Sequence, residues 1–265
     1  MARSAPKFRL SLIAGLNPAI YLLKEIAAWV APGQTVLSWR LIVRRGRFVT
    51  FEGGEGTGKS TQAAELAKRL EALGISVLVT REPGGSPGAE AIRHVLLSGA
   101  AKSLGPSAEA VLFAAARKDH LAETIRPALE RGQWVISDRF IDSTRVYQGV
   151  LGKVNAKLIT GLERLTVDEC YPDLTLVLDL PAEVGLARAA ARRGQAAPDR
   201  FEGEQFDFHR RLKSAYRMVA EREPERCAII QADGEPGAVA QRVWEIVAER
   251  LTPHRFALAA TRAAS

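Results

Sequence analysis

Gly53-Gly54-Glu55-Gly56-Thr57-Gly58-Lys59-Ser60 fits the pattern G-x-x-x-x-G-K-[ST]. Residues 48–51, just before it, are β-branched and aromatic, and residues 61–70, just after it, place apolar side chains at helical spacing. Glycines between a strand and a helix N-terminus leave backbone N–H groups and the positive end of the helix dipole free to hold phosphate. The stretch therefore predicts a phosphate-binding loop, the P-loop; the alternative is a glycine-rich turn with a chance Lys-Ser.

Strand-like and helix-like segments alternate from residue 47 onward. The expected strands are 48–51, 75–79, 134–137, 174–178 and 228–230, and the expected helices are 61–70, 88–98, 106–131, 142–149, 155–168, 182–193, 204–222 and 236–251. Strands separated by helices favour a parallel sheet with right-handed crossovers and ligands at the carboxyl ends of its strands. We therefore expect an α/β fold of three layers, a parallel sheet flanked by helices, with a short arginine-containing lid.

The positive charge is concentrated outside the segment that carries the P-loop. Of the net charge of +7, residues 1–46 contribute +6 and residues 252–265 contribute +2, which leaves −1 for residues 47–251. A nearly neutral domain argues against nucleic acid as a partner. The expected organisation is an N-terminal extension (1–46), a P-loop domain (47–251) and a C-terminal tail (252–265).

Residues 1–46 differ in composition from the rest. Residues 11–30 are apolar-rich, but Asn17, Pro18, Lys24 and Glu25 interrupt them, so a membrane span is not expected, and no signal-peptide cleavage site follows. The extension reads as a disordered or mis-assigned start, with an arginine-rich presequence or a membrane-surface helix as alternatives. The two cysteines form no disulfide or metal pattern, which favours a cytoplasmic protein.

Several side chains are expected to meet phosphate and metal at the carboxyl edge of the sheet. Lys59 suits the β- and γ-phosphates, Ser60 suits Mg²⁺, and Asp138, which ends the third strand, suits the organisation of that ion. The alternatives for Asp138 are a helix N-cap and a partner for Arg139. Arg81 and Arg139 follow strands at the same edge and Arg117 lies near it, so a second phosphate site is plausible, as a kinase needs.

A helix face and a basic stretch can each be interpreted either as structural or as functional. Phe113 and Arg117 are four residues apart and share a helix face, where they can bind a base, but spacing alone favours a core position for Phe113. The basic stretch from Arg188 through Arg192, Arg193 and Arg200 is either a lid or a solvated helix end. A lid arginine would be needed because Gly56 stands where the P-loop itself could have carried one.

Seven motifs in order resemble bacterial thymidylate kinase, over about residues 47–251. They are Phe51–Thr61, Thr80–Gly85, Leu112–Arg117, Asp138–Thr144, Tyr147–Gly149, Pro172–Thr175 and Asp199–Glu202. The resemblance implies transfer of the γ-phosphate of MgATP to dTMP, with Mg²⁺ as cofactor and a homodimeric assembly. It does not cover the extension or the tail.

The resemblance also implies roles for individual residues. The P-loop from Gly53 to Ser60, with Thr61 and Arg200, would bind ATP, and Ser60 and Asp138 would serve the metal. On the dTMP side, Phe113 would stack on the base and Arg117 would bind its edge, with Thr144 and Gln148 near the base. Tyr147 would crowd the sugar. Arg81 and Arg139 would hold the phosphate, and Glu82 would organise Mg²⁺ and water. Lys59, Arg139 and either Arg193 or Arg192 would be catalytic.

Other functions are compatible with the same residues. The acceptor could instead be dUMP, another nucleoside monophosphate or a deoxynucleoside. A P-loop switch that hydrolyses nucleotide is a second alternative, although no Asn-Lys-x-Asp guanine-reading motif is present. A catalytically dead binding protein is the least expected, because Lys59, Ser60, Asp138 and Arg139 are all in place.

Overall fold

Five parallel strands form the sheet in the computed structural model, which describes residues 45–194 and 200–253. The strands are β1 (Phe48–Glu52), β2 (Val77–Arg81), β3 (Trp134–Asp138), β4 (Leu174–Asp179) and β5 (Cys227–Gln231). Their order in the sheet is β2-β3-β1-β4-β5, so β1 lies at the centre between β3 and β4. The alternation read from the sequence is therefore confirmed as a parallel α/β sheet.

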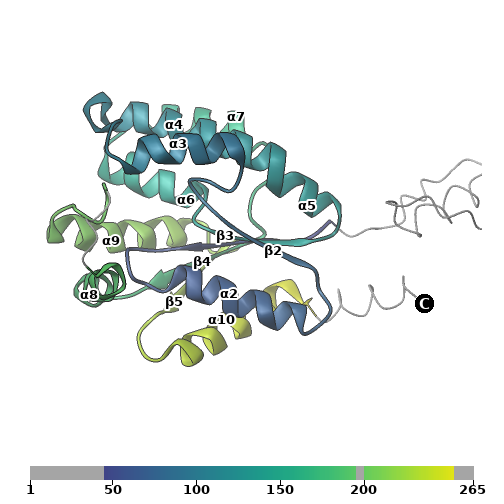
Figure 1. Cartoon of the computed structure of the whole chain (residues 1–265). Helices are drawn as coiled ribbons and strands as arrows, with labels where there is room; N and C mark the ends of the chain where they lie inside the picture. Colours follow the sequence, from purple (N-terminus) through teal and green to yellow (C-terminus); the bar gives the residue numbers. More distant parts are fainter. Residues whose placement is uncertain (1–44, 195–199, 254–265) are drawn as a thin grey trace, which may run out of the picture. The chain divides into compact units, whose positions relative to one another are not determined.

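Helices connect the strands and cover both faces of the sheet (Figure 1). The α-helices are α2 (Lys59–Glu71), α3 (Pro87–Leu97), α4 (Gly105–His120), α5 (Arg126–Glu130), α6 (Ile141–Thr144), α7 (Ala156–Thr166), α8 (Ala182–Arg193), α9 (Phe206–Arg222) and α10 (Pro236–Leu251). A short 3₁₀ helix, η1 (Lys102–Leu104), precedes α4, and two π-helical segments, η2 (Leu121–Ile125) and η3 (Arg145–Leu151), continue α4 and α6.

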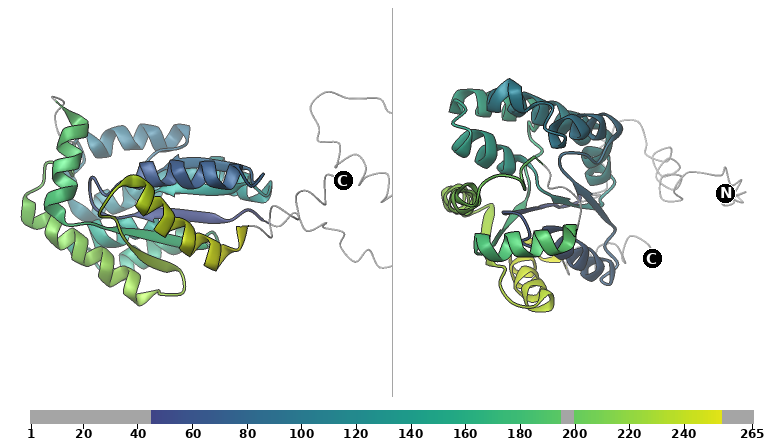
Figure 2. Two further views of the ribbon diagram at one scale, coloured as in Figure 1. Left: turned by 90° about the horizontal axis from the view of Figure 1, so that it is seen from below. Right: turned by 60° about the vertical axis from the view of Figure 1, so that its left-hand side comes forward.

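The three inner strands, β1, β3 and β4, are buried on both faces, as continuous apolar runs in parallel sheets are, whereas the edge strand β2 is partly exposed. One face packs on α2 and α10, where Leu66 and Val243 join Phe51 and Leu176 in a single apolar cluster. The other face packs on η2, α5 and α9 in two further clusters, one of them around Val135. Figures 1 and 2 show α2 and α10 together on one side of the sheet and α4 and α7 on the other.

The carboxyl edge of the sheet differs from the expected one by a few residues. The second strand begins and ends two residues later than predicted, at Val77 and Arg81, whereas the third ends at Asp138 as expected. In the register of the sheet Asp138 is paired with Phe51 on one side and with Arg81 on the other. The P-loop, the acidic residue and the first arginine are therefore neighbours at one edge.

The helix expected at 142–149 is divided between α6 and the π-helical η3. A π turn widens the helix by one residue and is frequent at functional sites. Apolar spacing does not distinguish it from an α turn, so the sequence did not predict it. Within the described ranges, no helix has the length and apolarity that a membrane crossing requires.

Candidate active site

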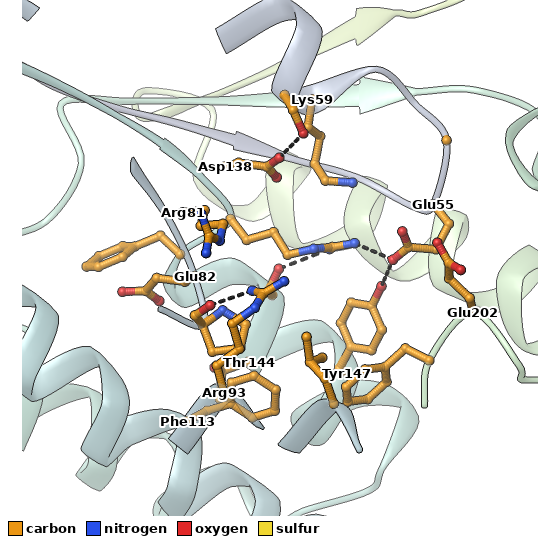
Figure 3. A pocket seen from close by; sticks show the side chains of 18 of the residues that line it. Glu55, Lys59, Arg81, Glu82, Arg93, Phe113, Asp138, Thr144, Tyr147 and Glu202 are labelled. Carbon is orange, nitrogen blue, oxygen red and sulfur yellow. Dashed lines mark hydrogen bonds and ion pairs between the residues drawn. The ribbon is translucent and has the colours of Figure 1, made fainter. Parts of the chain in front are cut away.

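A cavity of about 470 Å³ opens at the carboxyl edge of the sheet. It brings together most of the residues singled out from the sequence. Those that line it are Glu55, Gly56, Gly58, Lys59, Ser60, Thr61, Arg81, Glu82, Phe113, Arg117, Asp138, Arg139, Thr144, Tyr147, Gln148 and Arg192. In the view of Figure 3, Lys59 and Asp138 lie at one end and Phe113 and Thr144 at the other.

Five sequence-predicted residues are not part of this lining. Gly53, Gly54 and Thr57 line a much smaller space behind the P-loop, next to β4 and α9. Arg193 and Arg200 do not line the cavity and are paired with carboxylates, as described below. Residues 195–199, which belong to the expected lid, are outside the described residues.

The P-loop is shaped for close backbone approach. Gly58, with φ of 94°, caps the N-terminus of α2 in a left-handed conformation that favours glycine. Lys59 begins the helix, and its Nζ donates to the carbonyl oxygens of Gly54 at 2.7 Å and Gly53 at 3.2 Å. Burial, followed by the nearby Arg139, lowers the pKa of Lys59. The N-terminal N–H groups of α2 and this ammonium make the loop a cationic cradle.

Ser60 and Asp138 meet across the sheet edge. Ser60 Oγ donates to Asp138 Oδ2 at 2.5 Å. Hydroxyl and carboxylate oxygens are the ligands that Mg²⁺ prefers, and this ion usually takes only one or two of them from protein and the rest from water and phosphate. The pair fits Mg²⁺ on that ground. In the described part of the chain, no three His, Cys, Asp or Glu side chains are grouped as a metal-binding cluster.

Arg139 is held in a strained conformation at the centre of the cavity wall. Its φ of 71° is unusual for a residue with a side chain, and such strain is concentrated at functional sites. Its guanidinium donates to Glu55 at 2.5 Å, to the Gly53 carbonyl at 3.1 Å and to Tyr216 at 3.0 Å. Burial alone would raise the pKa of Glu55, but Arg139, Lys59 and Arg192 together lower it to about 2.

Glu52 lies directly beneath this arginine and was missed by the sequence analysis. It is fully buried and accepts hydrogen bonds from Phe140 N, from Ser143 N and Oγ, and from Tyr216 Oη. Burial, followed by the charge of Asp142, raises the pKa of Glu52 to about 7. Ser143 and Tyr216 also bond Arg139, so Glu52 supports the arginine indirectly.

Arg117 is part of a buried chain of polar groups rather than a free cation. Its Nε donates to Glu82 at 2.8 Å, and its Nη2 donates to Thr144 Oγ1 at 3.1 Å. Glu82 also contacts Nδ1 of the fully buried His120 at 3.2 Å. The carboxylate expected to serve Mg²⁺ is thus engaged with two side chains of α4, and it orients Arg117 beside Thr144.

Phe113 lies on the cavity wall and is only partly buried. This position differs from the core position favoured by spacing alone. Two other rings are close: Phe201 at 6.2 Å from Phe113, and Tyr147 at 5.2 Å from Phe201, measured between centroids. The aromatic wall and the Arg117–Thr144 pair together form a pocket of a size and polarity suited to a flat heterocycle.

Arg81 and Arg93 face the cavity from β2 and α3. Arg81 is paired with the half-exposed Glu90 at 2.9 Å, and Arg93 Nη1 donates to the Pro83 carbonyl at 2.5 Å. Arg93 was not predicted, because it lies in mid-helix without a motif. A helical spacing of four to Leu97, which also lines the cavity, is the signal that could have indicated it.

The arginines of the expected lid are in different surroundings. Arg192 lines the cavity and Arg193 does not, although both contact Glu202, at 3.2 and 2.9 Å. Arg200 is mostly buried and pairs with Glu109 at 3.2 Å and Glu204 at 2.6 Å. Of the three, Arg192 is the one presented to the cavity.

Known proteins resemble this chain in sequence and in fold. A sequence model of the thymidylate kinase family matches residues 51–243. Thymidylate kinase of Bradyrhizobium diazoefficiens is 60% identical over 209 residues, which are 79% of this chain and 92% of that protein. The thymidylate kinase of Nitrobacter winogradskyi is 58% identical over 220 residues, 83% of this chain and 96% of that protein.

A crystal structure of thymidylate kinase from Ehrlichia chaffeensis superimposes with a TM-score of 0.61 at 32% identity. The match covers 76% of this chain and 98% of that one. Sequence, fold and the composition of the cavity agree, and the chain belongs to the thymidylate kinase family.

Proposed function

We propose that this protein transfers the γ-phosphate of MgATP to dTMP and so forms dTDP. One observation carries the proposal beyond family membership: a single cavity has the P-loop with Lys59 at one end and the Phe113–Arg117–Thr144 pocket at the other. A phosphoryl donor and a nucleotide acceptor can therefore be held in one enclosure, which is what direct transfer requires.

The donor side is assigned to the P-loop. The backbone from Gly53 to Ser60 and the hydroxyl of Thr61 would bind the ATP phosphates, and Lys59 would reach the transferred group. Ser60 and Asp138 would hold Mg²⁺, which when bound supplies charge neutralisation and a template for the phosphates. The sequence-based assignment of Arg200 to ATP stays a prediction.

The acceptor side is assigned to the opposite half of the cavity. Phe113 would stack on the thymine, with Arg117, Thr144 and Gln148 at its polar edge. Tyr147, whose Oη donates to Glu55 at 3.4 Å, would border the sugar. The dTMP phosphate would lie among Arg81, Arg139 and Arg93, because these guanidinium groups line the space between the pocket and the P-loop.

The mechanism follows from the charges that are present. The attacking oxygen belongs to a phosphate that is already ionised, so a strong general base is not needed. The residues have to align the two phosphates and stabilise the charge that develops between them. We assign this to Lys59, Arg139 and Arg192, and we prefer Arg192 to Arg193 because it lines the cavity.

We propose that the activity resides in residues 47–251 and that the part of the extension before Val43 is not needed for it. The family match, which lies within residues 51–243, supports this. A chain that starts at Val43 should keep full activity and thermal stability. Loss of folding would show that the extension belongs to the domain.

A homodimer in the cytoplasm is the proposed working form. The family resemblance supports the dimer, and two buried, unpaired cysteines, Cys170 and Cys227, support a reducing compartment. Sedimentation equilibrium of the full chain measures the assembly. A species with the mass of one chain at micromolar concentration would contradict the dimer.

The test of the proposed function is ADP release measured with a panel of acceptors at fixed MgATP. We expect dTMP to give a higher kcat/KM than dUMP, AMP or thymidine. A preference for any of the other three would replace the assignment by the corresponding kinase. Release without any acceptor at the rate seen with dTMP would favour a nucleotide-hydrolysing switch.

A further inference from the structure

Glu109 is a buried carboxylate that the proposed mechanism does not use. It lies on α4 with 4% of its surface exposed. Its Oε1 accepts a hydrogen bond from Arg200 Nη2 at 3.2 Å, and its Oε2 is within reach of Gln148 Nε2 at 3.5 Å. Gln148 lines the cavity although only 2% of it is exposed. Glu109 thus contacts a residue of the acceptor pocket from behind.

The carboxylate of Glu109 fixes the orientation of the Gln148 side-chain amide. An ionised carboxylate can only accept hydrogen bonds, so the NH₂ group of the amide has to point toward it. The carbonyl oxygen Oε1 of Gln148 then points away from Glu109. No donor to that oxygen is found among residues 45–194 and 200–253, so it is available to a ligand in the cavity.

Arg200 makes the burial of this carboxylate tolerable. An unpaired buried charge is costly, whereas one that is paired and hydrogen-bonded is not. Arg200 contacts both Glu109 and Glu204 and lies over the ring of Phe201 at 4.8 Å. Arg200 thereby stabilises the carboxylate of Glu109, a group that can only accept hydrogen bonds, behind Gln148.

Thr144 supplies the opposite polarity one helical turn earlier. Its Oγ1 accepts from Arg117 Nη2 at 3.1 Å, so its hydroxyl proton is available for donation. An acceptor on Gln148 beside a donor on Thr144 matches an N–H next to a carbonyl. Thymine and uracil present this pattern at N3 and O4, whereas cytosine presents a lone pair at N3 next to an amino group.

We propose that Glu109 is a positioning residue for base specificity: it holds Gln148 as an acceptor and so selects a base that carries N3–H. The inference rests on the proposed function, since it concerns the acceptor of the same reaction. A site that offers a fixed acceptor discriminates strongly, because the wrong base leaves two buried lone pairs facing each other.

The experiment measures kcat/KM for dTMP and dCMP with the full chain. In Glu109→Gln the side chain can donate as well as accept, so the amide of Gln148 is free to rotate. We expect the dTMP/dCMP ratio to fall by about tenfold or more, mainly through KM. The variant Glu109→Gln/Gln148→Glu should restore the ratio, because the amide introduced at position 109 can donate to the carboxylate introduced at position 148 and still accept from Arg200.

Glu204→Gln is the matched control. It removes the other carboxylate of Arg200 without touching Gln148 and should leave the ratio within about twofold of wild type. An equal fall in this control, an unchanged ratio in Glu109→Gln, or no rescue in the double variant would overturn the proposal. If Glu109→Gln does not fold, Glu109→Asp, which retracts the carboxylate from Gln148, should lower the ratio instead; an unchanged ratio there would also overturn the proposal.

A measurement on the wild type separates this inference from the proposed function. A dTMP methylated at N3 lacks the proton that Gln148 would accept, so its kcat/KM should be at least about tenfold lower than that of dTMP. Equal values would end the specificity proposal while dTMP kinase activity stands. Absence of activity with dTMP itself would end the proposed function.

Discussion

Gly56 of the P-loop and Gly185 of α8 pack backbone against backbone. A methyl group on Gly56 would lie 1.9 Å from the Gly185 carbonyl oxygen, and one on Gly185 would lie 2.4 Å from the Glu55 carbonyl oxygen. Gly56 also has a φ of +65°, which disfavours any side chain. An arginine at Gly56 therefore cannot be accommodated while α8 keeps its place, and α8 is the helix that ends in Arg192 and Arg193.

Gly185→Ala should disturb the P-loop through this contact. Because the methyl group meets backbone rather than a movable side chain, we expect a loss of about 1–3 kcal/mol in unfolding free energy and a rise in KM for ATP. Gly161→Ala in α7 is the matched control: nothing lies within 4 Å of the added methyl group, so stability should rise by up to about 1 kcal/mol. Equal stability changes in the two variants would contradict the close contact.

Arg192→Ala should lower kcat more than Arg193→Ala. A guanidinium that stabilises charge on a transferred phosphoryl group is worth about 10³-fold or more in kcat. Arg193 shares the Glu202 partner but not the cavity, so its loss should cost less than about tenfold. Single-turnover rates with saturating ATP and dTMP measure the chemical step. The reverse order of effects would assign the role to Arg193.

Phe113→Ala should act on dTMP binding rather than on transfer. Stacking of a base on an aromatic ring is worth about 1–3 kcal/mol, so KM for dTMP should rise by about 10–100-fold with a smaller change in kcat. Val111→Ala on the same helix is the control, because Val111 is 48% exposed. Lys59→Ala should instead lower kcat with every acceptor. Unchanged dTMP kinetics in Phe113→Ala would show that the ring does not stack on the base.

Glu52 should make stability depend on pH. Burial raises the pKa of Glu52 to about 7 in the folded chain, so between about pH 4.5 and about pH 7 the folded state binds a proton that the unfolded state has lost. Stability contributed by this group therefore falls as pH rises through that window. Glu52→Gln removes the effect, and its Tm relative to wild type should be higher at about pH 8 than at about pH 5. The same Tm difference at both values would contradict the raised pKa.

The elements that carry local signals were predictable. Lys59, Ser60 and Asp138 follow strands or begin a helix, and a parallel sheet brings the ends of its strands to one edge whatever the rest of the chain does. The sheet register pairs Asp138 with both Phe51 and Arg81, so the carboxyl ends of these three strands lie side by side. Placing them required only the P-loop motif and the alternation of strand-like and helix-like segments.

Other parts of the site depend on packing that sequence spacing does not report. Arg93 faces the cavity because of how α3 docks, and Glu52 supports Arg139 only through the shared partners Ser143 and Tyr216. Glu109 looks like an ordinary acidic helix residue until Gln148 and Arg200 are placed beside it. The π turn that carries Gln148 shifts its side chain in a way that a 3.6-residue period cannot foresee.

Transfer of label from ATP marked on its γ-phosphate tests the central claim most directly. With dTMP present, the label should appear in dTDP in a one-to-one ratio with the ADP formed, and it should stay in ATP when dTMP is left out. Label that appears in inorganic phosphate at the same rate with and without dTMP would contradict the assignment of this cavity to phosphoryl transfer between two nucleotides.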